Sequence, residues 1–120
     1  MRVANPIAKR GEDLAAAFLQ KKGYKILDRN FRKGYGELDI ITIHNNILVF
    51  VEVKTRTSSA YGSPLEAITP WKLHALKRTA EYYALTHKCQ HMQMRMDAIS
   101  VNMLSQYEEF EIEHIENISG

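Results

Sequence analysis

The sequence contains a single cysteine, Cys89, and lacks any apolar run that approaches the roughly 20 residues of a membrane-spanning helix. One cysteine cannot form a disulfide within the chain or supply a cysteine-rich zinc cluster, so a reducing compartment suits the protein. The opening residues, MRVANPIAKRGEDL, lack the apolar segment of a signal peptide. Internal repeats and low-complexity segments are also absent. We therefore expect a cytoplasmic protein that does not enter a membrane.

Lysine and arginine are missing from the last 20 residues, which carry five acidic residues. The first 100 residues hold all 16 lysines and arginines against nine acidic residues. The net charge of +2 therefore conceals a more strongly basic body. Such a body suits a polyanionic partner such as nucleic acid, although solvated basic surfaces are common in proteins.

Capping residues and apolar periodicity predict two helices and five strands. One helix begins at Asn5 and Pro6 and ends before Gly23, and the other begins at Thr69 and Pro70. We expect strands at residues 24–28, 37–44, 47–55, 94–103 and 110–118, a tight turn at 45–46 and a brief helical turn at 63–66. A chain of 120 residues makes one domain, residues 1–120, in which helices pack on a sheet.

The two strands in the middle of the chain carry charged residues among β-branched and aromatic ones. Because side chains alternate along a strand, Glu37 shares a face with Asp39, and Glu52 shares a face with Lys54. Five of the six residues 47–52 are apolar and the sixth is Glu52. This pattern is typical of a central strand, buried on both faces, that ends at a functional site.

Pairing of these two strands would bring the carboxylates of Asp39 and Glu52 together. Like charges in a poorly hydrated place repel and raise each other's pKa unless a cation lies between them. Lys54 is one such cation, so a salt-bridged structural cluster is one interpretation. The other is that Mg²⁺ or Mn²⁺ balances the remaining charge, because hard cations that keep some of their waters suit a site with few carboxylates.

Four further residues call for a choice between structure and function. Glu12 lies on the apolar face of the first helix, either as a site residue or as an acid favoured by the helix dipole. Lys72, a cation in the first turn of the second helix, opposes that dipole and is expected to face the site. For Asp97 we favour a buried structural acid over an outer-shell site residue. For Trp71 we favour packing over a platform for base stacking.

Residues 29–35 are expected to form a basic, aromatic connection between two strands. Arg29, Arg32 and Lys33 can bind phosphates there and the two aromatic rings can stack on bases, although a plain surface loop is equally consistent. The H-x-C-x-H cluster at 87–91 offers metal-binding residue types. No neighbouring residue completes the four ligands of zinc, so we expect no zinc site in this cluster.

Asp39, Glu52, Val53 and Lys54 form the pattern D-x12-E-V-K, which resembles the signature of the PD-(D/E)XK nucleases. A wider set of motifs, over residues 8–101, resembles the YraN-like family of predicted endonucleases. This set comprises Gly11-Glu12, Gly23-Tyr24, Arg29-Asn30, Gly36-Glu37-Leu38-Asp39 and Phe50-Val51-Glu52-Val53-Lys54-Thr55-Arg56. Archaeal Holliday junction resolvases are similar in order, with an acid on the first helix, then the Asp, then E-x-K.

The resemblance implies a restriction-endonuclease-like core, an α/β fold with a mixed β-sheet of about five strands flanked by helices. It implies that Asp39, Glu52 and the Val53 carbonyl hold Mg²⁺ or Mn²⁺. Glu12 would be the helix acid of the site. Lys54 would orient or activate water and stabilise the charged transition state.

The chain departs from the superfamily pattern at two positions. Leu38 stands before Asp39 where the superfamily has proline, a change that the YraN-like family tolerates. Glu37 has no counterpart in the minimal motif. It is therefore a candidate for the outer shell of the site, with a metal ion, Lys72 or a second subunit as its partner.

The implied activity is metal-assisted hydrolysis of phosphodiester bonds in nucleic acid, with DNA as the expected partner. Phosphate contacts carry no sequence information, so we expect selectivity for branched or junction-like structure, and a homodimer if both strands of a junction are cut. A non-catalytic nucleic-acid-binding module with the same fold is the alternative. An adaptor that binds proteins through the acidic tail rests on charge asymmetry alone. The expected phosphate-binding residues are Arg29, Arg32, Lys33, Arg56 and Lys72.

Overall fold

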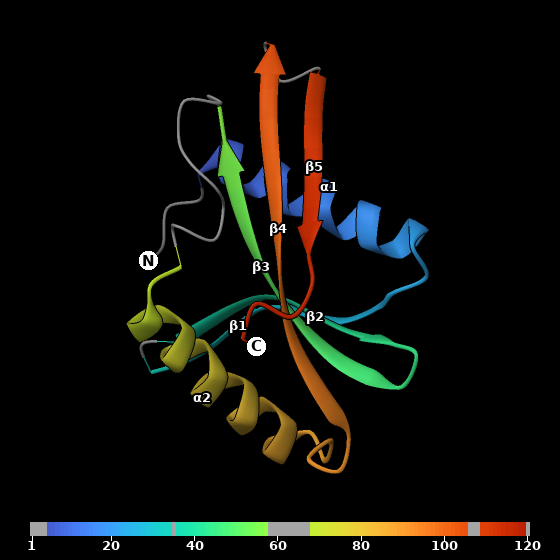
Figure 1. Ribbon diagram of the computed structural model, residues 1–120, viewed down its shortest axis with the longest axis vertical. Coiled ribbons are helices and arrows are strands. Elements are labelled where there is room, and N and C mark those ends of the chain that lie inside the picture. The colour runs from blue at the N-terminus through green and yellow to red at the C-terminus, as the bar shows by residue number, and fades with distance from the viewer. Residues whose placement is uncertain (1–4, 35, 58–67, 106–108, 120) are drawn as a thin grey trace.

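The computed structural model describes residues 5–34, 36–57, 68–105 and 109–119 (Figure 1). The helical turn expected at 63–66 lies outside these residues. Within the described ranges, seven helices and strands follow one another: α1 (Pro6–Lys21), β1 (Lys25–Lys33), β2 (Gly36–His44), β3 (Ile47–Arg56), α2 (Pro70–Thr86), β4 (Gln93–Ser105) and β5 (Glu109–Ile115).

The five strands form one mixed sheet in the order β1-β2-β3-β4-β5. All neighbouring strands are antiparallel except β3 and β4, which run parallel and are joined by the crossover that contains α2. A parallel pair needs such a crossover, because a tight turn can only reverse the chain. The predicted α/β fold is confirmed: a five-stranded mixed sheet with two helices, consistent with a restriction-endonuclease-like fold.

Side-chain caps begin both helices at the predicted residues. The Asn5 side chain accepts hydrogen bonds from the N–H groups of Ile7 and Ala8, at 3.0 and 3.4 Å. The Thr69 hydroxyl accepts a 3.1 Å bond from the Lys72 N–H. Each cap satisfies helix N–H groups that have no partner within the helix, and proline follows each cap because the first helical N–H is not needed.

The sheet buries a core on each face, because alternate residues of β3 point to opposite sides. Val49 and Val51 face α1, whereas Leu48 and Phe50 face α2. The α1 core also contains Ala15, Leu19, Tyr24, Ile40, Ile99 and Val101. The α2 core also contains Leu38, Ile41, Leu76, Ala80, Tyr83 and Met96. Burial on both faces confirms the interpretation of β3 as a central strand.

The central hairpin turns at Asn45 and Asn46, whose φ angles are 52° and 64°. Two successive left-handed residues are typical of the hairpin turn whose twist matches that of the strands, and asparagine tolerates this conformation well. His44 therefore pairs with Ile47, which aligns β2 with β3 up to the pair Ile40 and Val51.

Two expectations about the edges of the sheet are wrong. The basic stretch predicted to connect two strands at residues 29–35 is largely strand, because β1 continues to Lys33. The last strand ends at Ile115 and not at residue 118. Residues 29–33 of β1 lack the alternation of apolar and polar side chains on which the prediction relied. After β5, Asn117 has a φ of 57°, a left-handed conformation that does not continue an extended strand.

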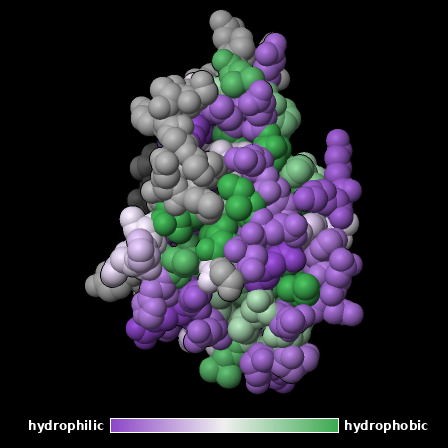
Figure 2. Space-filling view, viewed as in Figure 1, coloured by the Kyte–Doolittle hydropathy of each residue, from purple (hydrophilic) through white to green (hydrophobic). Residues whose placement is uncertain are grey.

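Apolar side chains are also exposed outside the two cores. In the space-filling view, hydrophobic residues reach the surface between hydrophilic ones (Figure 2). Trp71 is the most exposed of the large apolar residues described, with 71% of its surface accessible. In the described part of the chain, neither helix has the length and apolar content needed to cross a membrane.

Candidate active site

The candidate site lies where β2 and β3 separate. Their pairing ends at Ile40 and Val51, and each strand then follows its other neighbour: β2 stays paired with β1 to Gly36, and β3 stays paired with β4 to Arg56. This leaves a fork between the two central strands. Asp39 and Glu52 are the first residues of the fork, one on each strand.

Asp39 bridges the fork. Its Oδ2 accepts a 2.8 Å hydrogen bond from the N–H of Val53. Because the N–H and C=O of one strand residue point to the same side, the Val53 carbonyl also faces the fork. Burial, together with the negative charges of Glu52, Glu12 and Glu37, raises the pKa of Asp39 from 3.8 to about 7, against the opposing effect of the bond from Val53. The surroundings of Asp39 therefore favour its protonated, neutral form over the ionised carboxylate.

Glu52 is held between two lysines. Only 8% of its surface is exposed, and the ammonium groups of Lys54 and Lys72 each lie 3.3 Å from its Oε1. Lys54 follows Glu52 on the same face of β3, whereas Lys72 reaches the site from the first turn of α2. Burial and the neighbouring Lys72 lower the pKa of Lys54. Lys72 stands in the first turn of α2, where a cation opposes the helix dipole, because it forms an ion pair with the buried Glu52 carboxylate.

Glu12 approaches the site from α1 and is oriented by Arg29 of β1. The guanidinium of Arg29 donates to Glu12 Oε1 from Nε at 3.2 Å and from Nη2 at 3.0 Å. The preceding residue, Gly11, is buried against Thr55 of β3, where a Cβ on the glycine would overlap the threonine hydroxyl. Glycine therefore allows α1 to lie close to the strand that carries Glu52, and the charge of Glu12 reaches Asp39.

Asp39 and Glu52 open into a cleft of about 420 Å³ between the fork and α2. Glu37 also lines this cleft and forms a 3.3 Å ion pair with Arg32. Lys72 and Trp71 line it from the helix. The cleft thus combines three carboxylates, a cation and an exposed aromatic ring. The sequence pattern indicated the acids and Lys72.

Asp97 lies on the other face of the sheet, opposite to Glu52. It pairs with Val51, whose side chain belongs to the α1 core. It accepts hydrogen bonds from Arg95, from the His114 ring at 2.8 Å and from the Asn117 N–H at 2.9 Å. Burial raises the pKa of Asp97, but these bonds more than offset it and lower the pKa overall. This geometry matches the interpretation of Asp97 as a buried structural acid that ties β5 to β4.

Three of the expected phosphate-binding cations pair with acids of the site: Arg29 with Glu12, Arg32 with Glu37, and Lys72 with Glu52. The other two lie at the ends of neighbouring elements. Lys33 is the last residue of β1, and Arg56 is the half-buried last residue of β3.

The environment of Trp71 differs from the one expected from the sequence. Its exposure of 71% rules out packing in the core, one of the two packing roles, core or edge, favoured from the sequence. The available signal was its position in the first turn of α2, before the buried stripe of the helix begins. In contrast, His87 stacks on Tyr83 at 3.8 Å between ring centroids. No group of three or more His, Cys, Asp or Glu side chains in the described ranges is placed to hold a metal ion.

Comparison with known proteins places the chain in a family. The model of the uncharacterised protein family UPF0102 matches residues 11–101, which include every residue of the fork. The chain belongs to the UPF0102 family. The match confirms the YraN-like resemblance that the motifs indicated.

Relatives in the UPF0102 family are similar over most of their length. A UPF0102 protein of Caldicellulosiruptor saccharolyticus is 46% identical over 111 residues, which cover 92% of this chain and 94% of the relative. A UPF0102 protein of Syntrophomonas wolfei is 48% identical over 91 residues, covering 76% and 79%. One from Alkaliphilus oremlandii is 42% identical over 109 residues, covering 89% and 92%.

Proposed function

We propose that this protein is a metal-dependent nuclease that hydrolyses phosphodiester bonds of nucleic acid. One observation carries the proposal: two carboxylates from separating strands, Asp39 and Glu52, open into one cleft with a lysine beside them. Burial and the neighbouring carboxylates raise the pKa of Asp39 to about 7, and a bound cation would favour its ionised form.

The donor set fits a hard divalent cation, Mg²⁺ or Mn²⁺. Asp39, Glu52 and the Val53 carbonyl would hold it. Ions of this kind are bound through one or two carboxylates and complete their shell with water and substrate phosphate, which agrees with the small number of protein ligands. When bound, the ion polarises a phosphoryl oxygen and lowers the pKa of a coordinated water.

The remaining site residues would act on charge and position. Lys54 Nζ lies beside Glu52, where it would stabilise the negative charge that develops on the attacked phosphate. Lys72 forms an ion pair with the same carboxylate and holds it at the cleft. Arg29 fixes Glu12, the second candidate for positioning the attacking water.

The proposed substrate is DNA with a branched or junction-like structure. The residues expected to bind phosphate lie on β1, β3 and the first turn of α2, and phosphate contacts alone do not discriminate sequence. We propose a homodimer for cleavage of both strands of a junction, because each chain supplies one fork.

The test is cleavage of labelled DNA and RNA substrates, both linear and branched, with Mn²⁺, Mg²⁺ or EDTA. We expect products with either metal, none with EDTA, and none from Asp39→Asn or Glu52→Gln. Glu81→Gln, which changes an exposed acid of α2, is the matched control and should retain full activity. Cleavage that survives both site substitutions would point to a contaminating nuclease.

A non-catalytic nucleic-acid-binding module is the second candidate. It is favoured by the two lysines on Glu52 and by Arg29 on Glu12, because these ion pairs already neutralise two of the acids. This function predicts binding of the same substrates with no cleavage in any metal. It also predicts that Asp39→Asn leaves binding intact.

A further inference from the structure

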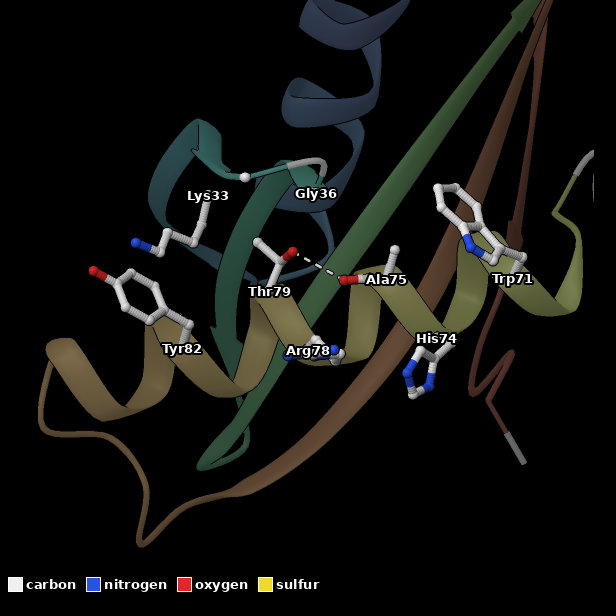
Figure 3. Close-up of a pocket in the computed structure, with 9 residues that line it drawn as sticks. Lys33, Gly36, Trp71, His74, Ala75, Arg78, Thr79 and Tyr82 are labelled. Carbon is white, nitrogen blue, oxygen red and sulfur yellow. Dashed lines mark hydrogen bonds between the residues drawn. The ribbon is translucent and has the colours of Figure 1, made fainter.

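A second cleft of about 420 Å³ continues from the candidate site along α2 (Figure 3). Gly36, Trp71 and Ala75 line both clefts, so the two share a border. Beyond this border the second cleft is lined by Lys33 of β1 and by His74, Arg78 and Tyr82 of α2. None of the described residues that line the second cleft is acidic.

The lining of the second cleft follows from helix geometry and from one glycine. Trp71, His74, Arg78 and Tyr82 are spaced by three or four residues, which places them along one side of α2. Gly36 starts β2 directly beneath this helix, where a Cβ would overlap Thr79. With no side chain at Gly36, the helix lies close to the strand and the wall of the cleft is formed by α2.

The side chains along this cleft match the chemistry of an unpaired nucleotide. Trp71 exposes 71% of its surface at the border, and its ring projects from the first turn of α2 (Figure 3). At the other end, Lys33 Nζ lies 4.7 Å from the centroid of the Tyr82 ring, so a cation and an aromatic face occur together. Aromatic rings stack on exposed bases, and Lys33 and Arg78 can bind the phosphates between them. Bases within a duplex are already stacked on each other and offer no free face.

We propose that the second cleft binds unpaired nucleotides next to the scissile phosphate, with Trp71 as a stacking platform at the border of the two clefts. The position of the scissile phosphate rests on the proposed function, whereas the binding of unpaired nucleotides does not. The substrate class is then a nucleic acid with an unpaired extension or branch beside a duplex.

Trp71 is the only tryptophan of the chain, so its fluorescence reports on the cleft directly. The probe is a short DNA duplex with an extension of about six unpaired thymidines, compared with the same duplex without it. Titrations in EDTA exclude cleavage. A parallel probe with a uridine extension compares RNA with DNA. We expect the extended duplex to quench the tryptophan fluorescence and the blunt duplex to leave it nearly unchanged.

Matched substitutions assign the effect to the cleft. Trp71→Ala should weaken binding of the extended duplex on the order of tenfold, and Trp71→Phe should restore most of it, because a phenyl ring still stacks. Leu85→Ala, at another exposed apolar residue of α2, should have no effect. Arg78→Gln should weaken binding, whereas Lys77→Gln, the neighbouring exposed cation outside the cleft, should not. Binding of the variants is measured by anisotropy of a labelled probe.

The proposal is overturned if wild type binds extended and blunt duplexes equally, or if Trp71→Ala binds the extended duplex as tightly as Leu85→Ala does. Failure of the nuclease proposal looks different. If no metal supports cleavage but the extended duplex still quenches the fluorescence, the nuclease proposal fails and the binding of unpaired nucleotides in the second cleft stands. Cleavage without preference for the extension would remove the second cleft alone. Absence of any nucleic-acid binding would remove both.

Discussion

Asp39 and Lys54 show how the fork alters individual groups. Burial and three neighbouring carboxylates raise the pKa of Asp39 to about 7, while burial and Lys72 lower the pKa of Lys54. Each change moves the group toward its neutral form. Such opposed shifts within one site are typical of catalytic centres, although ion-pair networks also produce them. Substitutions at Lys54 and Asp39 distinguish a catalytic centre from a structural network of ion pairs.

Lys54→Ala should reduce the cleavage rate on the order of 10²- to 10³-fold, the usual cost of removing one preorganised electrostatic group. Substrate affinity should change little, because many phosphate contacts remain. Single-turnover kinetics give the rate, and circular dichroism with thermal melts checks that the variant folds. Lys77→Ala is the control for a lysine outside the site. A folded Lys54→Ala protein that cleaves at the wild-type rate would reduce Lys54 to a counter-ion of Glu52.

Asp39 should make the metal-free protein less stable as pH rises. Its folded-state pKa of about 7 lies above the ordinary 3.8, so between these values the folded protein retains a proton that the unfolded chain has released. This contribution is complete below about pH 4 and is lost as pH rises through about 7, on the order of 2–4 kcal/mol in all. Urea unfolding in EDTA across this range, for wild type and Asp39→Asn, measures it. A difference between the two proteins that is independent of pH would contradict the raised pKa.

At the scale of elements, the site depends on strands that stop pairing and on helices that lie close to them. The β2–β3 ladder ends at Ile40 and Val51, and beyond it the Val53 N–H donates a hydrogen bond across the fork to Asp39. Glycines on α1 and β2 let both helices approach: Gly11 against Thr55, and Gly36 against Thr79. Stability and site geometry are therefore coupled at these contacts.

A divalent cation held by Asp39 and Glu52 would link the two strands of the fork. Mn²⁺ or Mg²⁺ should therefore raise the free energy of unfolding, by about 2.7 kcal/mol when free metal is 100 times its dissociation constant. Asp39→Asn should abolish the gain, and Glu81→Gln should keep it. Thermal melts with a metal titration provide the measurement. Wild-type melts that do not respond to millimolar metal would favour the salt-bridged cluster.

Gly36→Ala should move β2 away from α2, because the added methyl group meets the Thr79 side chain. We expect a loss of about 1–3 kcal/mol in stability, as for other overpacked sites, together with weaker activity. Thr79→Ala removes the nearest atom and should recover part of the loss in the double variant. A double-mutant cycle from urea unfolding tests this coupling. Additive effects of the two substitutions would show that the contact does not limit the packing.

At the scale of the whole molecule, charge is distributed unevenly. All 16 lysines and arginines lie in the first 100 residues, and the last 20 residues carry five acids and no cation. In the described part of the chain β5 is an edge strand paired with β4, so its acids lie at one side of the sheet. The fork lies between β2 and β3, away from that edge.

Binding to duplex DNA should be electrostatic and largely blind to sequence. The logarithm of the association constant should fall with the logarithm of salt concentration, with a slope of roughly −0.9 per phosphate neutralised. Replacing Arg32 and Lys33 with glutamate should lower affinity for all sequences alike. Replacing Lys88, an exposed cation beyond the end of α2, is the comparison. Affinity that does not change between low and physiological salt would remove the main support for a nucleic-acid partner.

Local sequence was sufficient for most of the elements. Asn5 and Thr69 mark the helix starts because their side chains cap N–H groups only a few residues away. The turn at Asn45 and Asn46 aligns the central hairpin because asparagine tolerates a left-handed backbone. The positions of Asp39 and Glu52 near the ends of the aligned pairs follow from the same local rules. These features depend on contacts over a short stretch of chain, which the order of residues determines directly.

The tertiary structure decided the face, the exposure and the partners of the remaining residues. Asp97 takes the face opposite to Glu52 because β4 aligns with β3 across the α2 crossover, which no local pattern specifies. Trp71 is exposed because α2 turns its buried stripe toward Leu38 and Phe50, leaving the first turn at the edge of a cleft. Arg29 pairs with Glu12 across 17 positions in the chain. Each outcome depends on which distant segments share the limited space around the sheet, and that competition is settled only when the whole chain packs.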